Sequence, residues 1–130
     1  MKIENKDDYI SYRFRRAEES LDDALIMIEN KKWNTAINRL YYSCFYAVIA
    51  LFLKNNIETR THDGARTIFS NKYIKTGILD KNYGKLFSKL FDYRQKGDYG
   101  DLFDFDENMV LPLVDQTKDF LSAIKNLIER

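Results

Sequence analysis

The sequence predicts an all-α protein, an antiparallel up-and-down bundle of four to five helices that forms one domain over residues 1–130. Apolar residues recur with a period close to 3.6 along almost the whole chain, as they do on one face of a helix. One proline and five glycines are too few for the many tight turns of an all-β fold. Hydrophobic residues make up 45% of the chain, which suffices for a packed core and argues against disorder.

The first two predicted helices cover residues 8–29 and 33–54. Asp7 or Asp8 is the expected N-cap of the first helix. The second helix is apolar on nearly all sides, so we expect it to be the central helix of the bundle or to form a subunit interface as well. The residues on the face opposite its main apolar stripe are Tyr42, Tyr46, Ile49 and Ala50.

A polar connection at residues 55–61 leads to the third predicted helix. Thr59 or Thr61 is its expected N-cap, and its apolar positions run from His62 toward Tyr73. Thr76 followed by Gly77 indicates where this helix stops.

Two more helices complete the bundle. The fourth has an apolar stripe from Tyr83 to Phe91 that Arg94 continues, and the last runs to Ile128 with Pro112 in its first turns, where a missing N–H is tolerated. The residues expected to cap or end these two helices are Asp80, Gly97, Gly100, Asp104 and Asp106.

Charge and cysteine content exclude several classes of protein. With 21 Lys and Arg against 20 Asp and Glu, the net charge is +1, so no overall excess of charge points to a polyanionic or polycationic partner. The single cysteine, Cys44, excludes an intramolecular disulfide and a multi-cysteine zinc site. The N-terminus lacks an apolar signal region, and the most apolar stretch, residues 40–53, is too short to span a bilayer. We expect a soluble cytoplasmic protein.

The segment around Arg94 is the most informative for chemistry. Arg94 lies on an apolar stripe, so its guanidinium is expected to point inward, where it needs a carboxylate, a carbonyl or a ligand phosphate. Asp98, one helical turn later, can supply the carboxylate, and Tyr99 adds a hydroxyl. The two interpretations are therefore a structural Arg–Asp pair and a site for a phosphate.

His62 is the only histidine, so a histidine-rich metal site within one chain is excluded. It stands at a predicted helix N-terminus, where its pKa is lowered and free N–H groups face an anion. It is a candidate for acid/base chemistry or for a structural hydrogen bond. The acidic series between Asp98 and Glu107 lacks the spacing of a calcium loop, so we expect no metal and no cofactor.

The remaining candidates are basic and aromatic residues that can contact phosphates or stack on bases. Those expected to bind RNA or a nucleotide are Arg39, Tyr42, Arg60 and Arg94, and Arg13 and Arg16 either join them or pair with nearby acids.

Four segments, taken in order, resemble the HEPN superfamily, and within it the small stand-alone, UPF0332-like branch. They are A-I-N-R-L-Y-Y-S-C-F-Y-A at residues 36–47, T-H-D-G at 61–64, Y-I-K-T-G-I-L at 73–79 and R-Q-K-G-D-Y-G-D at 94–101. The resemblance implies a helical bundle that dimerises through helix faces. It also implies pairing with a minimal nucleotidyltransferase in toxin–antitoxin or stress-defence modules.

Many proteins of this superfamily are metal-independent endoribonucleases, in which an Arg is followed four to six residues later by a His. The Arg stabilises the scissile phosphate and the His transfers protons. Here Arg94 matches the Arg, but Tyr99 stands where the His is expected, and with an ordinary pKa near ~10 it is a poor base. His62 can substitute only if the fold brings it near Arg94.

The sequence therefore leaves three hypotheses. The first is a toxin-like protein that acts on or binds RNA through the candidate catalytic residues Arg94, Asp98, Tyr99 and His62. The second is a non-catalytic module with a degenerate site that binds a nucleotide or docks a nucleotidyltransferase, in which Tyr99 is a candidate target of nucleotide transfer. The third is a helical homodimer without a ligand, whose Arg94–Asp98 pair is structural.

Overall fold

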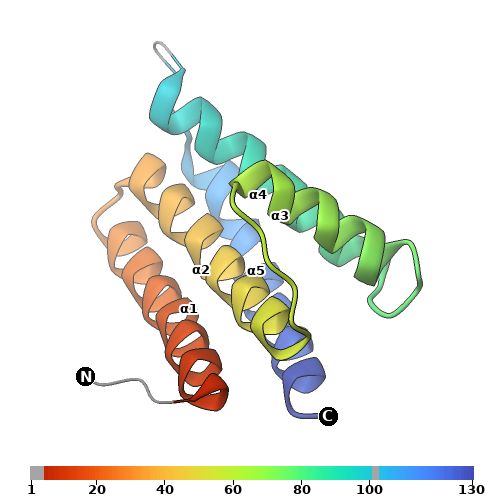
Figure 1. The fold of residues 1–130 in the computed structure, drawn as a ribbon. Helices are drawn as coiled ribbons and strands as arrows, with labels where there is room; N and C mark the ends of the chain where they lie inside the picture. Colours follow the sequence, from red (N-terminus) through yellow and green to blue (C-terminus); the bar gives the residue numbers. More distant parts are fainter. Residues whose placement is uncertain (1–4, 101–102) are drawn as a thin grey trace.

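The computed structural model describes residues 5–100 and 103–130, and every regular element in these residues is helical, as predicted (Figure 1). The third helix continues directly into one short π-helical stretch, η1. The elements in chain order are α1 (Lys6–Glu29), α2 (Trp33–Lys54), α3 (His62–Phe69), η1 (Ser70–Ile74), α4 (Lys81–Tyr99) and α5 (Glu107–Ile128).

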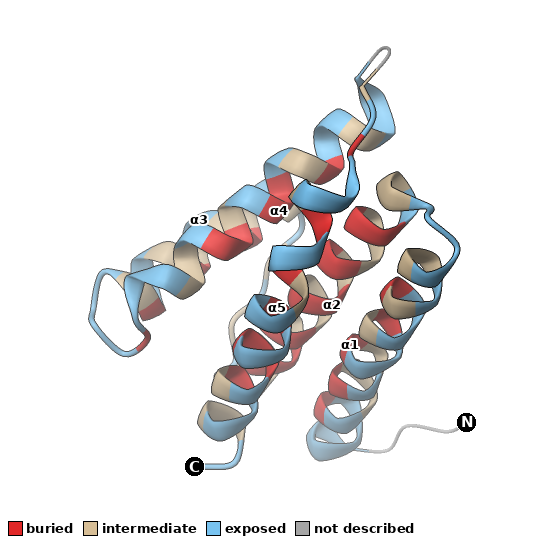
Figure 2. Ribbon diagram, turned by 180° about the vertical axis from the view of Figure 1, so that it is seen from behind, coloured by how far each residue is buried: buried red, intermediate tan, exposed pale blue. Residues whose placement is uncertain are grey.

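Helix α2 is the centre of the bundle, as its all-round apolar sequence predicts. It packs against α1, α3, α4 and α5, and the residues along its core side are fully buried (Figure 2). By length and hydropathy alone α2 passes as a membrane-crossing helix, since it extends beyond the apolar stretch at residues 40–53. However, 61% of its most apolar window is buried against the other helices, which is what a core helix requires.

Most helix starts follow the predicted capping chemistry. The side chains of Thr61, Asp80 and Asp106 each accept a hydrogen bond from a backbone N–H in the first turn of α3, α4 and α5. The prediction for α1 is wrong, because Asn5 rather than an aspartate caps it and accepts from the N–H of Asp8 at 2.9 Å.

The connection between α2 and α3 departs from simple up-and-down order. Residues 55–61 run back along the bundle instead of turning tightly, so α3 begins beside the middle of α2 (Figure 1). His62 consequently packs against Tyr41 and Phe45, which lie roughly two and a half to three and a half turns before the end of α2. This connection decides which side chains meet at the candidate site.

The third helix ends differently from the expectation. Regular α-helix stops at Phe69, and the chain passes through η1, whose side chain Tyr73 is buried, before the turn at Gly77. Gly77 has φ +80°, a backbone conformation that glycine adopts without strain, which accounts for the predicted stop at this residue. The α3–α4 hairpin forms a second layer beside the other helices (Figures 1 and 2).

Because α2 is buried on several sides, truncating a core residue there should destabilise the protein strongly. Leu40 is fully buried, so Leu40→Ala is expected to lower the free energy of unfolding by about 2–5 kcal/mol, measured by urea denaturation. Leu111→Ala is the matched control, because Leu111 is 43% exposed on α5, and it should change stability by about 0.5 kcal/mol or less. Equal losses in the two variants would contradict the central position of α2.

Candidate functional site

Arg94 is buried in aromatic surroundings near the end of α4. The residue is 8% exposed, and its guanidinium carbon lies 5.1 Å from the centre of the Tyr41 ring and 5.6 Å from that of Tyr42. Its Nη1 donates a hydrogen bond to the Tyr42 hydroxyl at 3.1 Å. The positive charge is therefore stabilised mainly by aromatic faces and one phenol oxygen.

The predicted Arg94–Asp98 pair is only a loose one. The closest approach, from Nη1 to Oδ2 of Asp98, is 3.9 Å, which is too long for a hydrogen bond. The same oxygen accepts a hydrogen bond from the side chain of Asn38 at 3.0 Å. The Nε of Arg94 is buried and has no hydrogen-bond partner in the described residues. A buried guanidinium donor without a partner is costly, so the pair with Asp98 does not account for this arginine.

The fold brings His62 to the same place. Its Nδ1 lies 2.8 Å from the hydroxyl oxygen of Tyr41, and its ring stacks on Phe45 with ring centres 4.2 Å apart. Burial lowers the pKa of His62 below its ordinary value of 6.5, and the nearby charge of Arg94 lowers that pKa further. His62 is therefore neutral at pH 7, and His62 and Arg94 both lie against Tyr41.

The hydrogen bond to Tyr41 also selects the tautomer of His62. Burial raises the pKa of Tyr41 well above its ordinary value of 10, so this hydroxyl keeps its proton. Nδ1 is the one acceptor that the described residues offer to it. When Tyr41 donates to Nδ1, the proton of the neutral imidazole lies on Nε2. His62 then presents an N–H donor on its other side, which suits an anionic oxygen.

Of the other predicted site residues, some lie beside Arg94 and one lies apart from it. Arg39 stands over the Tyr42 ring at 5.0 Å and donates two hydrogen bonds to Asn38, which joins it to Asp98. Tyr99 is 72% exposed, with its ring centre 5.9 Å from the guanidinium carbon of Arg94. Arg60 makes no contact with Arg94 or His62 among the described residues and borders a separate hollow beside the end of α2.

Arg13 and Arg16 stay on α1. Their guanidinium groups stand over the rings of Tyr12 and Tyr46, and Arg16 also pairs with Glu19 at 3.5 Å. Neither contacts Arg94 in the part of the chain that the structure describes.

Sequence reasoning missed Tyr41, Phe45 and Asn38. The first two belong to the apolar face of α2, where an aromatic residue is ordinarily a core residue, so their position at the site depends on the path of residues 55–61. Asn38 gives no signal of its own, because a polar residue between apolar ones is normal on a helix. The site is thus built from the middle of α2, the start of α3 and the end of α4.

The acidic residues do not form a metal centre in the described part of the chain, where no group of three or more His, Cys, Asp or Glu is placed to hold an ion. Asp106 caps α5, and Asp101 lies outside the described residues. Cys44 is fully buried, and that burial raises the pKa of its thiol, which makes it an unreactive core residue.

Comparisons with known proteins found one matching family model and several similar proteins. The family model of the HEPN domain matches residues 10–127. A UPF0332 protein of Thermotoga maritima is 39% identical over 98% of this chain and 96% of its own. Two proteins of Methanocaldococcus jannaschii carry the name “Putative toxin”. One is 35% identical over 64% of this chain and 62% of its own length. The other is 29% identical over 87% of this chain and 77% of its own length.

The position of His62 beside Arg94 predicts a measurable pKa. Because His62 is the only histidine, its imidazole proton resonance can be followed directly by NMR. We expect titration with a midpoint below 6.5, moving up toward 6.5 in Arg94→Gln, which removes the neighbouring charge. Lys96→Gln, an exposed change on the same helix, is the control and should leave the midpoint unchanged.

The same shift predicts how stability depends on pH. Since the folded state lowers the pKa of His62, the unfolded chain takes up the proton first as the pH falls. The contribution of His62 to stability is therefore complete above about pH 6.5 and is lost as the pH falls from there through the folded-state pKa. His62→Gln should remove this component of the pH dependence in urea denaturation.

Proposed function

The chain belongs to the HEPN family, and from this premise we propose that it is a toxin-type protein that binds RNA through Arg94 and His62. The relatives named as toxins support the toxin part of the proposal. The RNA part rests on the chemistry of the site, which places an arginine and a neutral histidine among aromatic rings.

The buried and incompletely paired guanidinium of Arg94 is the observation that carries the proposal. Its Nε lacks a partner and its nearest carboxylate is 3.9 Å away, so the site has an unused capacity for an oxyanion. A phosphate oxygen beside the guanidinium would supply an acceptor. The exposed ring of Tyr99 is available to stack on a base.

His62 contributes a second donor to the same phosphate. With Nδ1 held by Tyr41, the Nε2–H of a neutral imidazole donates to an oxyanion without adding a charge that would repel Arg94. A neutral donor of this kind binds a phosphate over the whole range above pH 6.5.

Metal-independent RNA cleavage is the second candidate function, and the nearness of His62 to Arg94 favours it. To act as a base toward a 2′-hydroxyl, His62 must expose an unprotonated Nε2, which requires Tyr41 to accept a hydrogen bond from Nδ1–H instead of donating one. Binding needs no such exchange. Binding is therefore the primary proposal, and a non-catalytic module that docks a partner remains the alternative.

The partners form part of the proposal. We infer a homodimer through the half-buried face of α2, because Phe45, Tyr46 and Ile49 lie there beside the site and remain incompletely covered within one chain. A minimal nucleotidyltransferase is the proposed second partner, on the strength of family membership, and the cytoplasm is the proposed location.

The dimer proposal predicts a selective effect of one charge on this face. Ile49→Glu should convert the dimer to a monomer in analytical ultracentrifugation, because a carboxylate in an apolar interface loses its hydration without gaining a partner. Ile26→Glu is the matched control, since Ile26 is 50% exposed on α1, and it should leave the oligomeric state unchanged. A monomeric wild-type protein would overturn this part of the proposal.

The RNA proposal predicts that Arg94 controls both binding and any cleavage. Arg94→Ala should weaken binding of single-stranded RNA by about tenfold or more, measured by fluorescence anisotropy, because it removes a charge-assisted contact of roughly 1.5–3 kcal/mol. Lys96→Ala, an exposed change two residues away, should have a much smaller effect.

A cleavage assay with and without EDTA, run on the same proteins, separates the two candidate functions. Cleavage that persists in EDTA but disappears in Arg94→Ala and His62→Gln would establish the nuclease. Binding without cleavage would support the primary proposal. Binding that is unchanged in Arg94→Ala would refute the assignment of the site.

A further inference from the structure

Charge is segregated along the chain even though the total is nearly zero. Residues 60–99, which contain α3, η1 and α4, have nine Lys and Arg against four Asp and Glu, an excess of five positive charges. The rest of the chain has twelve Lys and Arg against sixteen Asp and Glu. Because α3 and α4 form a separate layer (Figure 1), one side of the molecule is strongly basic.

A hollow follows the seam between the two helices of this layer. One part of about 310 Å³ is bordered by Lys81, Lys85 and Ser88 of α4, by Arg66 of α3 and by Ser70 of η1. Phe69, Ile74 and Phe87 also line this part. A second part of about 270 Å³ shares Arg66, Ser70 and Ser88 and extends to Lys75. Together they make one groove, which we call the basic groove, with cations along both edges and hydroxyl groups between them.

The lysines of the basic groove are exposed and have no acidic partner. No ion pair involves Lys75, Lys81 or Lys85 in the described residues. Lys81 and Lys85 are one helical turn apart, which separates them by about 6 Å along α4. This separation is similar to that between successive phosphates of one nucleic-acid strand.

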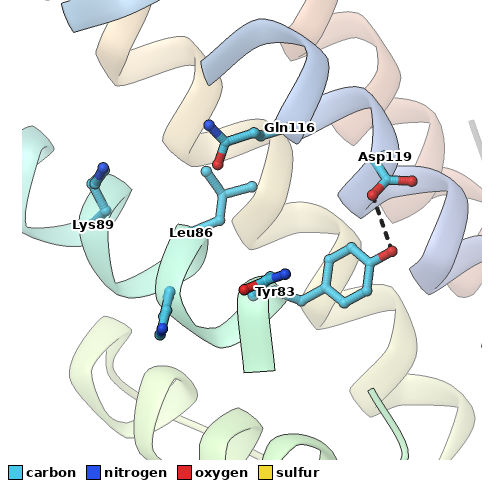
Figure 3. A pocket seen from close by; sticks show the side chains of 7 residues that line it. Tyr83, Leu86, Lys89, Gln116 and Asp119 are labelled. Carbon is cyan, nitrogen blue, oxygen red and sulfur yellow. Dashed lines mark hydrogen bonds between the residues drawn. The ribbon is translucent and has the colours of Figure 1, made fainter. Parts of the chain in front are cut away.

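The flank of α4 that faces α5 carries an acidic residue as well as lysines. A hollow between α4 and α5 also has lysines at its edge, but Asp119 lies within it and accepts a hydrogen bond from Tyr83 at 3.1 Å (Figure 3). A carboxylate there repels a phosphate, so this hollow is excluded from the proposed surface.

The basic groove is linked to the candidate site through buried aromatic side chains. Arg66 lies one turn after His62 on α3, and its guanidinium covers the ring of Phe91 at 4.3 Å. Phe91 in turn contacts Tyr41, the residue that holds His62 and supports Arg94, at 6.1 Å between ring centres. Asp63 and Asp92 pair with Arg66 at this junction and offset its charge, so the cations of the groove without an ion-pair partner among the described residues are its lysines.

We propose that the basic groove binds the phosphate backbone of single-stranded RNA whose neighbouring phosphate lies at Arg94 and His62, an inference that rests on the proposed function. The groove supplies the charge contacts that hold the strand, and the site supplies the contacts to one phosphate. Neutral donors at Ser70 and Ser88 suit phosphate oxygens and ribose hydroxyls between the lysines.

An acidic protein segment is the competing occupant of a basic surface. Two features favour nucleic acid. The groove lies near the candidate site, where the buried Nε of Arg94 has no partner in the described residues, and the part that extends to Lys75 is bordered by cationic, hydroxyl and amide side chains. The other part also has Phe69, Ile74 and Phe87 in its lining.

The test uses the full chain and a fluorescent oligouridylate with 2′-O-methyl groups, which cannot be cleaved through the 2′-hydroxyl. The groove variant is Lys75→Gln/Lys81→Gln/Lys85→Gln. The control is Lys32→Gln/Lys118→Gln/Lys125→Gln, which removes the same charge from exposed positions outside the α3–α4 layer. All six positions are exposed, and circular dichroism melting confirms that both variants fold.

We expect the groove variant to lose about tenfold or more in affinity at low salt. The slope of log K against log salt concentration should decrease by about 2, since each lost phosphate contact on a single strand contributes about 0.7. The control variant should have nearly the wild-type slope, apart from the small change that the loss of three positive charges causes anywhere on the protein. Equal slopes in the two variants would overturn the groove proposal.

The remaining outcomes separate the groove from the proposed function. If Arg94→Ala weakens RNA binding but the groove variant does not, the groove proposal fails and the function stands. If the groove variant weakens binding but Arg94→Ala does not, the groove stands and the assignment of the site fails. If the wild type binds poly-glutamate through these lysines and does not bind the oligonucleotide, the surface takes an acidic protein and the proposal is wrong.

Discussion

A buried tyrosine in the middle of α2 contacts both polar side chains of the candidate site. Tyr41 is fully enclosed, yet its hydroxyl reaches His62 at the start of α3, and its ring supports the guanidinium of Arg94 on α4. The same ring stacks on Phe87 in the core. One side chain therefore couples the core to both polar groups of the site, so that neither can move without disturbing the packing of three helices.

The electrostatic consequence is a cation that is desolvated but not neutralised. A carboxylate within hydrogen-bond distance would satisfy Arg94 and leave it inert, whereas Asp98 stays 3.9 Å away and shares its oxygen with Asn38. Aromatic faces stabilise a guanidinium without consuming its donors. Burial, and after it the field of this guanidinium, lowers the pKa of His62, so that the site holds one permanent charge and one neutral donor instead of two repelling cations.

Local sequence signals predicted most of the fold and only part of the site. The caps Thr61, Asp80 and Asp106 and the all-round apolar α2 follow from short-range chemistry, and each was predicted correctly. The inward position of Arg94 follows from helical periodicity in the same way. What sequence could not supply is the return of residues 55–61 along the bundle, because an irregular connection has no period. The meeting of His62 with Arg94 depends on that path.

That path also bears on the missing histidine of the family motif. At the motif position Tyr99 is 72% exposed on the last turn of α4. His62 arrives instead from α3, inside the aromatic cluster and with its Nδ1 already engaged. The geometry that brings an imidazole to Arg94 thus fixes it as a donor, which is why binding, and not proton transfer, is the chemistry that this arrangement favours.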